Sequence, residues 1–138
     1  MSCLPPRAFD TFAAAYPERP TVFDHDLCQH PLMTLDALAA LAERLPPSCI
    51  EHAASQQPIG IEGKPAVPAI GPAEAIRAID SCGIWVALSF IEQDPAYHAL
   101  LMAVIEELRP AIEPRTGRIH KPAAFVFVTS PGGTTPYH

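Results

Sequence analysis

Charged residues are scarce in this sequence, and basic residues do not cluster. Only 17% of the 138 residues are charged, the formal net charge is −6, and no run of lysine or arginine occurs. A nucleic-acid surface needs a basic face that neutralises phosphates, so the composition argues against that class of function. The apolar content of 49% is too high for a chain that is disordered throughout.

Long hydrophobic runs and paired cysteines are absent as well. The apolar stretches are too short to span a bilayer, and no signal-peptide pattern follows Met1, so we expect a cytoplasmic protein. No CxxC pair occurs, which predicts reduced thiols instead of a zinc site or a disulfide framework. Phosphate-loop and nucleophile-elbow motifs are also missing. The four widely separated cysteines are Cys3, Cys28, Cys49 and Cys82.

Proline, by contrast, is abundant. The chain has 17 prolines, about twice the average frequency. Because proline is excluded from central strands and from the middle of helices, much of the chain should be loop. The longest such segment, residues 53–72, is rich in proline and glycine, and it either covers a site or is an insertion. We interpret residues 1–138 as a single α+β domain.

Apolar periodicity predicts helices between these loops. Residues 35–44 have the spacing of a helix with one buried face, and Thr34 is suited to cap it. A short helix should start near Pro72. The clearest helix begins after Asp94, which is a good cap, and we expect Pro110 to end it. Residues 1–20 are predicted to be an arm with one helical turn.

Two apolar runs predict strands. Residues 84–91 are almost entirely apolar, which is typical of a strand that is buried on both faces. Residues 124–129 form the second strong strand, and residues 21–23 form a short one. A turn at 130–133 follows the second strand. The closing residues are expected to begin a new strand, so we expect the sequence to be truncated.

The closing segment, TSPGGTTPYH at 129–138, is the most specific motif in the chain. A strand and a glycine-rich turn that lead to Thr-Pro-x-His resemble the entry into the double-stranded β-helix of cupin-like Jumonji-C proteins, the iron(II)/2-oxoglutarate oxygenase superfamily. Residues 25–46 and 76–101 resemble the bacterial cupin-like subgroup of that family. The resemblance implies N-terminal helices plus the first strands of a cupin, or jelly-roll, barrel, with strands 84–91 and 124–129 extending one of its sheets.

The same resemblance implies roles for two residues. His138 matches the first histidine of the metal triad, and Thr135 matches the threonine that contacts the carboxylate of 2-oxoglutarate. Such iron sites use two histidines and one carboxylate, which leaves three positions for cosubstrate and oxygen. The other two ligands have no counterpart in this sequence, so we expect the N-terminal fragment of an iron(II)/2-oxoglutarate-dependent hydroxylase, inactive alone. Its substrate would be a protein or small-molecule side chain.

Other interpretations stay open. The chain can be a non-catalytic cupin-like binding or regulatory module, with exposed strand edges in 124–138 covered by a partner or in a homodimer. It can also be a small interaction domain unrelated to the family. His138 can be a frayed terminal residue, and Thr135 can be a simple turn threonine. Several further residues are expected to have structural roles only. We expect Asp24, His25 and Asp26 in a solvated loop and Glu106 and Glu107 on a solvated helix face. Trp85 and Tyr97 are expected in the core.

Overall fold

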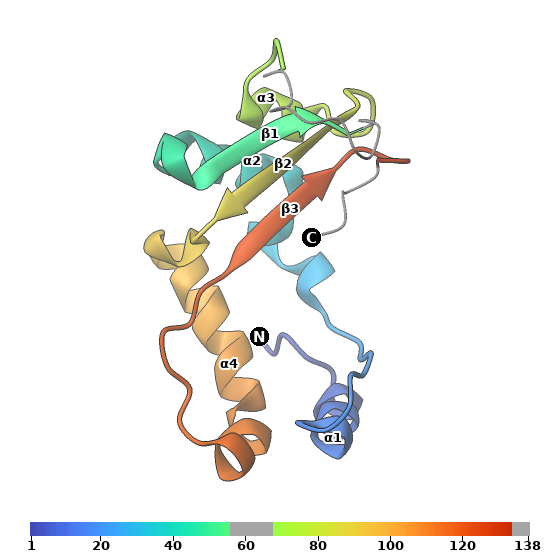
Figure 1. Cartoon of the computed structure of the whole chain (residues 1–138), viewed down its shortest axis with the longest axis vertical. Coiled ribbons are helices and arrows are strands. Elements are labelled where there is room, and N and C mark those ends of the chain that lie inside the picture. The colour runs from blue at the N-terminus through green and yellow to red at the C-terminus, as the bar shows by residue number, and fades with distance from the viewer. Residues whose placement is uncertain (56–67, 134–138) are drawn as a thin grey trace. The chain divides into compact units, whose positions relative to one another are not determined.

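The computed structural model describes residues 1–55 and 68–133. Within these residues the chain is α+β, with four α-helices and one three-stranded antiparallel sheet of order β1-β2-β3 that does not close into a barrel (Figure 1). The described residues form two compact units. One combines Met1–Thr34 with Glu92–Ala124, and the other takes its residues from Leu35–Ile91 and Phe125–His138. None of the described helices is both long and apolar enough to cross a membrane.

The sheet of the second unit is built around its middle strand. β2 (Ile84–Ser89) pairs with β1 (Ile50–Ala54) on one side and with β3 (Phe125–Thr129) on the other. The predicted strands at 84–91 and 124–129 are thus confirmed, apart from one or two residues at their ends. β2 is largely buried, as its apolar run predicts. β1 was not predicted, because the sequence IEHAA has no strong apolar pattern.

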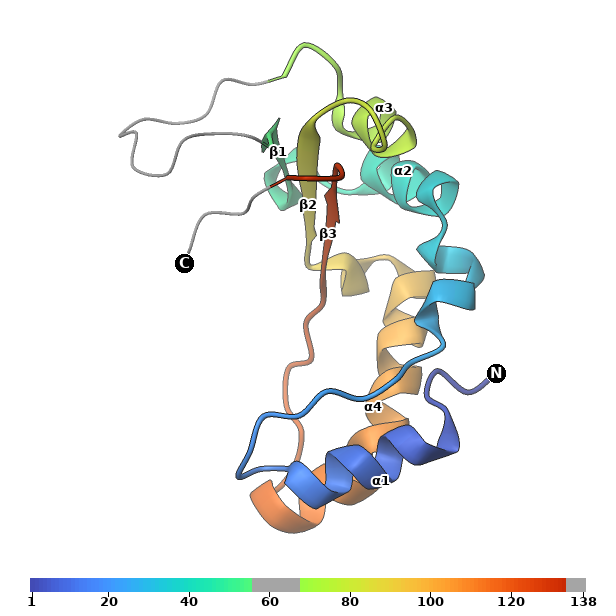
Figure 2. The ribbon, with the colours of Figure 1, turned by 90° about the vertical axis from the view of Figure 1, so that its right-hand side faces the viewer.

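Two helices cover one face of this sheet. α2 (Leu35–Arg44) packs against α3 (Pro72–Arg77), and α3 packs on β1 and β2 (Figure 2). The predicted helix at 35–44 is confirmed, and so is a short helix starting at Pro72. Arg77 of α3 pairs with Glu43 of α2 at 3.1 Å. The side chains that fill the core between helices and sheet are Leu38, Leu41, Ile76, Ile79, Ile84, Val86, Leu88 and Val128.

The first unit joins α1 (Pro6–Ala15) to the long helix α4 (Pro95–Thr116). The prediction of an arm with one helical turn was wrong, because α1 has ten residues. Its start is favoured by Pro6, whose missing N–H has no partner to lose in the first turn. The phenol of Tyr16, at the end of α1, lies 2.6 Å from the hydroxyl of Thr116. Residues 21–23 are not a strand, and Val22 is 94% exposed.

The start of α4 agrees with the sequence, and its end does not. The Asp94 carboxylate accepts hydrogen bonds from the N–H groups of Ala96 and Tyr97, which confirms the predicted cap. Pro110 does not end the helix, which continues to Thr116. Proline in a helix removes one backbone hydrogen bond. Here Arg109 binds the carboxylates of Glu106 and Glu113 on neighbouring turns, and so braces the helix across the proline.

Candidate functional site

The two residues singled out by the terminal motif, Thr135 and His138, lie outside the described residues. So does most of the predicted loop at 53–72, although residues 53 and 54 belong to β1. What the structure describes is the element that leads into the motif. β3 ends at Thr129, and a turn at 130–133 follows it directly, as predicted.

Ser130 anchors the turn. Its hydroxyl donates a hydrogen bond to the carbonyl oxygen of Ile79 at 2.6 Å and accepts one from the N–H of Ile84 at 3.1 Å. The Ser130 N–H donates to the carbonyl of Ile84 at 3.0 Å. Ser130 is only 4% exposed, so these bonds form away from water, where an unmade one is costly. One side chain thus ties the end of β3 to the segment between α3 and β2.

Gly133 fixes the other end of the turn. A Cβ at this position would lie 2.7 Å from Cγ2 of Thr129, 2.9 Å from the carbonyl oxygen of Ser130 and 2.9 Å from Cβ of Ser55. Such distances are shorter than any stable contact between these atoms, and one of the neighbours is backbone. Ser55 is itself buried directly after β1. Glycine is therefore required where the chain passes between the ends of β1 and β3.

The sheet face opposite α2 and α3 carries exposed aromatic side chains. Phe125 and Phe127 alternate along β3 with the core-facing Val128, and they are 50% and 61% exposed. Phe90, at the end of β2, packs on Phe125 with 5.0 Å between ring centroids. Its φ of 53° lies in the left-handed region that bulky side chains rarely adopt. The strand before the motif thus presents an apolar surface.

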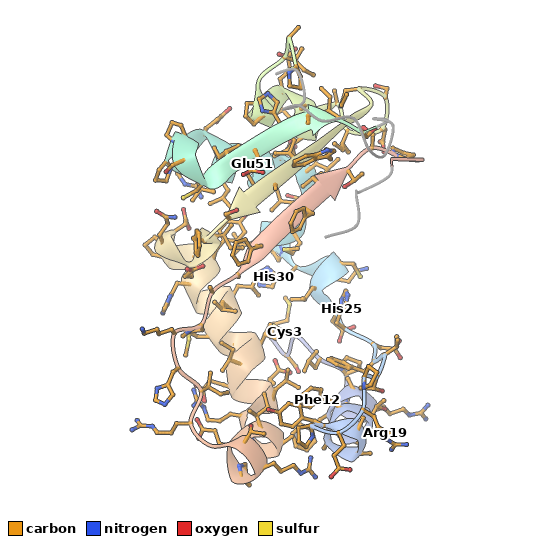
Figure 3. The ribbon with its side chains drawn as sticks, in the orientation of Figure 1. Cys3, Phe12, Arg19, His25, His30 and Glu51 are labelled. Atoms are coloured by element: carbon orange, nitrogen blue, oxygen red, sulfur yellow. The ribbon has the colours of Figure 1, made fainter. Side chains whose placement is uncertain are left out.

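The histidines of the described chain have structural or solvent-facing positions, and Figure 3 labels two of them, His25 and His30. His30 Nδ1 accepts the N–H of Leu32 at 3.2 Å, and His52 Nε2 lies 3.1 Å from the carbonyl oxygen of Ile70. His25 is exposed in the loop that precedes the short helix at Leu27–Gln29. Within residues 1–55 and 68–133, no three His, Cys, Asp or Glu side chains are grouped so that they could hold a metal ion.

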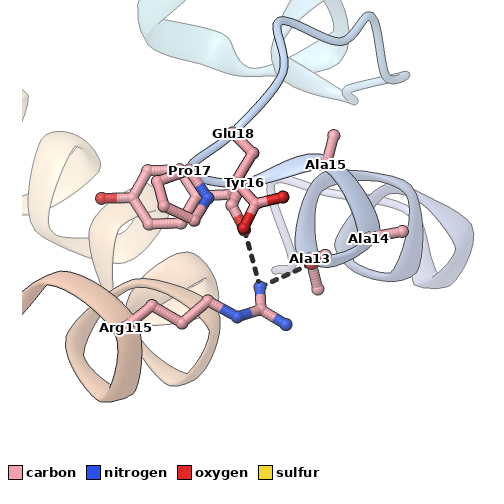
Figure 4. Close-up of a pocket in the computed structure, with 7 residues that line it drawn as sticks. All are labelled: Ala13, Ala14, Ala15, Tyr16, Pro17, Glu18 and Arg115. Carbon is pink, nitrogen blue, oxygen red and sulfur yellow. Dashed lines mark hydrogen bonds between the residues drawn. The ribbon is translucent and has the colours of Figure 1, made fainter.

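A cavity of about 430 Å³ lies between the end of α1 and α4 (Figure 4). The guanidinium of Arg115 donates to the carbonyl oxygens of Ala13 and Tyr16, and so caps the carboxyl end of α1. A cation is favourable there, because the last carbonyls of a helix carry partial negative charge. The cavity holds no acid–base pair or nucleophile with an activating partner, and we assign Arg115 a structural role.

Comparison with known proteins gave no match among family models, curated proteins or solved structures. The resemblance to cupin-like proteins therefore stays a prediction from the residues quoted above. Sequence reasoning named the turn at 130–133 but missed the roles of Ser130 and Gly133 in holding it. The pair of adjacent glycines was the available signal for Gly133. The bonds of Ser130 join segments that are distant in sequence, and no local pattern indicates them.

Proposed function

We propose that this chain supplies the N-terminal part of a cupin-like iron(II)/2-oxoglutarate-dependent oxygenase of the hydroxylase type. One observation supports the proposal most directly. An antiparallel strand, β3, ends in a glycine turn held by Ser130, and the sequence Thr-Thr-Pro-Tyr-His follows at once. This is the order of elements that the family motif requires. The three-stranded sheet would belong to one sheet of the double-stranded β-helix.

In this proposal His138 is one ligand of iron(II), and Thr135 binds the carboxylate of 2-oxoglutarate. The described residues do not themselves form an iron site. We therefore derive no reaction step from their geometry. The role we assign to them is support: the turn at 130–133 sets where the chain enters the site, and the buried face of the sheet keeps that turn in place. The substrate would be a side chain of a protein or of a small molecule.

Anaerobic titration with iron(II) in the presence of 2-oxoglutarate tests the proposal. The polypeptide produced from the native gene should bind one equivalent, and His138→Ala should abolish the binding. His120→Ala is the matched control, because His120 is an exposed histidine of a loop in the described chain. Absence of saturable binding, or binding that His138→Ala leaves unchanged, would contradict the proposal.

A second candidate function is a non-catalytic binding module, and the exposed edge strand β3 favours it. β3 lies at an edge of the described sheet, and its sequence FVFVT contains neither charge nor proline. Natural edge strands usually carry such residues as protection against pairing with another chain. This edge would be covered by a partner protein or by a second copy of the chain. Sedimentation of the native protein that gives a concentration-independent monomer would count against the homodimer.

A further inference from the structure

The segment before α1 is held by a single carboxylate on α4. Glu107 Oε1 accepts the N–H of Cys3 at 2.6 Å, and Glu107 Oε2 accepts the N–H of Leu4 at 3.1 Å. The hydroxyl of Ser2 lies 2.8 Å from the same Oε2, and also 2.8 Å from the carbonyl oxygen of Leu4. Two consecutive backbone donors and one hydroxyl thus converge on one side chain. Glu107 was predicted to lie on a solvated helix face; it is half-buried, and its carboxylate holds this segment.

The opposite side of this segment is held as well. The N–H of Asp26 donates to the carbonyl oxygen of Cys3 at 2.8 Å. Residues 2–4, which we call the strap, are therefore fixed between α4 and the loop around Asp26. The side chains of Cys3 and Leu4 are 4% and 6% exposed, whereas Cys28 is exposed in the short helix at Leu27–Gln29. The strap thus holds its own Cys3 thiol away from solvent.

The neighbours of the Glu107 carboxylate affect its pKa and that of Cys3. Asp26 and Glu107 both line a cavity of about 400 Å³ beside the strap. The Cys3 thiol also interacts with Glu107, and the charged amino group of Met1 acts on that thiol in the opposite direction, lowering its pKa. Burial raises the pKa of Glu107, but the hydrogen bonds from Cys3, Ser2 and Leu4 outweigh it and hold that pKa below its ordinary value. Burial and Glu107 both raise the pKa of Cys3.

We propose that the strap is a latch: ionised Glu107 keeps residues 2–4 docked with the side chain of Cys3 buried, and neutralising Glu107 releases them and exposes the thiol. A carboxylate offers acceptors for both amides at once. A neutral glutamine keeps only one acceptor oxygen, and its NH₂ group would face backbone donors. Because hydrogen bonds to a charged group are the strong ones, their loss favours the open strap by a large factor.

Thiol labelling of the full chain at neutral pH tests the latch, with each cysteine followed by peptide mapping. In the native protein, Cys3 should react with iodoacetamide about 100-fold more slowly than exposed Cys28, because it reacts only from an open state. Glu107→Gln should raise the rate at Cys3 at least about tenfold. Glu106→Gln is the matched control, since its exposed carboxylate binds Arg109 and not the strap, and it should leave Cys3 unchanged.

Half-buried Cys82, in the other compact unit, separates local opening from loss of the whole fold. If Glu107→Gln raises the labelling rate of Cys3 alone, the latch is supported. An equal rise in the labelling rate of Cys82, or an unchanged rate at Cys3, would overturn it. Amide hydrogen exchange on the native protein gives a test that needs no variant: the Cys3 and Leu4 amides should be protected at neutral pH, and exchange at the rate of an unstructured peptide would refute the latch.

Discussion

The hydroxyl of Ser130 accepts a hydrogen bond from the backbone N–H of Ile84, so the first residue after β3 is tied to the first residue of β2. The same hydroxyl reaches the carbonyl of Ile79, beyond the end of α3. The turn that leads to the Thr-Pro-x-His motif is thus fixed by the core of its own unit. In the proposed oxygenase, this fixation would set the entry of the chain into the iron site.

Ser130→Ala should destabilise the fold by about 2–3 kcal/mol, because it leaves the buried N–H of Ile84 and carbonyl of Ile79 without this partner. Urea denaturation followed by circular dichroism measures the change. Ser81→Ala is the control, since the Ser81 hydroxyl is exposed and makes only a long contact of 3.5 Å with the carbonyl of Ala78. Equal stabilities of the two variants would show that Ser130 is no anchor.

Gly133→Ala should also destabilise the protein, by about 1–3 kcal/mol, because the new methyl group overlaps the backbone of Ser130 and the side chain of Ser55. Gly71→Ala, at the cap of α3, provides a matched glycine with open space around it, and it should change stability by less than about 1 kcal/mol. Thermal unfolding of both variants distinguishes the two sites. A Gly133→Ala protein as stable as the parent would mean that the turn has room to move.

Substitutions at two neighbouring residues of β3 should differ in how much they change the free energy of unfolding. Phe127→Thr changes an exposed side chain and should alter the free energy of unfolding by less than about 1 kcal/mol. Val128→Thr places a hydroxyl in the core and should cost about 1–3 kcal/mol. If the aromatic face mediates association, Phe127→Thr should also lower self-association in sedimentation experiments. A large loss of stability in Phe127→Thr would show that this face is covered.

The stability of the unit that contains α1 and α4 should depend on pH through Glu107. The folded pKa of Glu107 is lowered, so its contribution is fully present above the pKa of an unfolded glutamate, about 4.3, and is lost as the pH falls through the lowered folded value. The native protein should therefore exceed Glu107→Gln in stability by about 1–3 kcal/mol at pH 6–7, and the two should converge in strong acid. A difference that does not change with pH would contradict this assignment.

Elements with local signals were predictable from the sequence. The buried run at 84–91 and the periodic segment 35–44 carry their own patterns, and Asp94-Pro95 marks the start of α4 with a cap and a proline in its first turn. The α+β class follows from these elements alone. Tyr97 of α4 is buried, as predicted.

The predictions that were wrong or missing concern places where tertiary contacts override the local preferences of the sequence. β1 forms because β2 offers a pairing edge, although IEHAA is a weak strand sequence. α4 continues past Pro110 with the ion pairs of Arg109 on either side. The bonds of Glu107 to residues 2–4 span about a hundred positions, and no sequence pattern encodes them. Thr135 and His138, outside the described residues, stay predictions of the motif.

Visible absorption of the native gene product, loaded with iron(II) without oxygen, tests the central claim most directly. Addition of 2-oxoglutarate should produce a saturable charge-transfer band with one equivalent of iron. Thr135→Val should require at least about tenfold more 2-oxoglutarate, the effect of one lost hydrogen bond to a charged carboxylate, and His138→Ala should show no band. A band of equal strength and equal 2-oxoglutarate dependence in the native protein and in both variants would contradict the account.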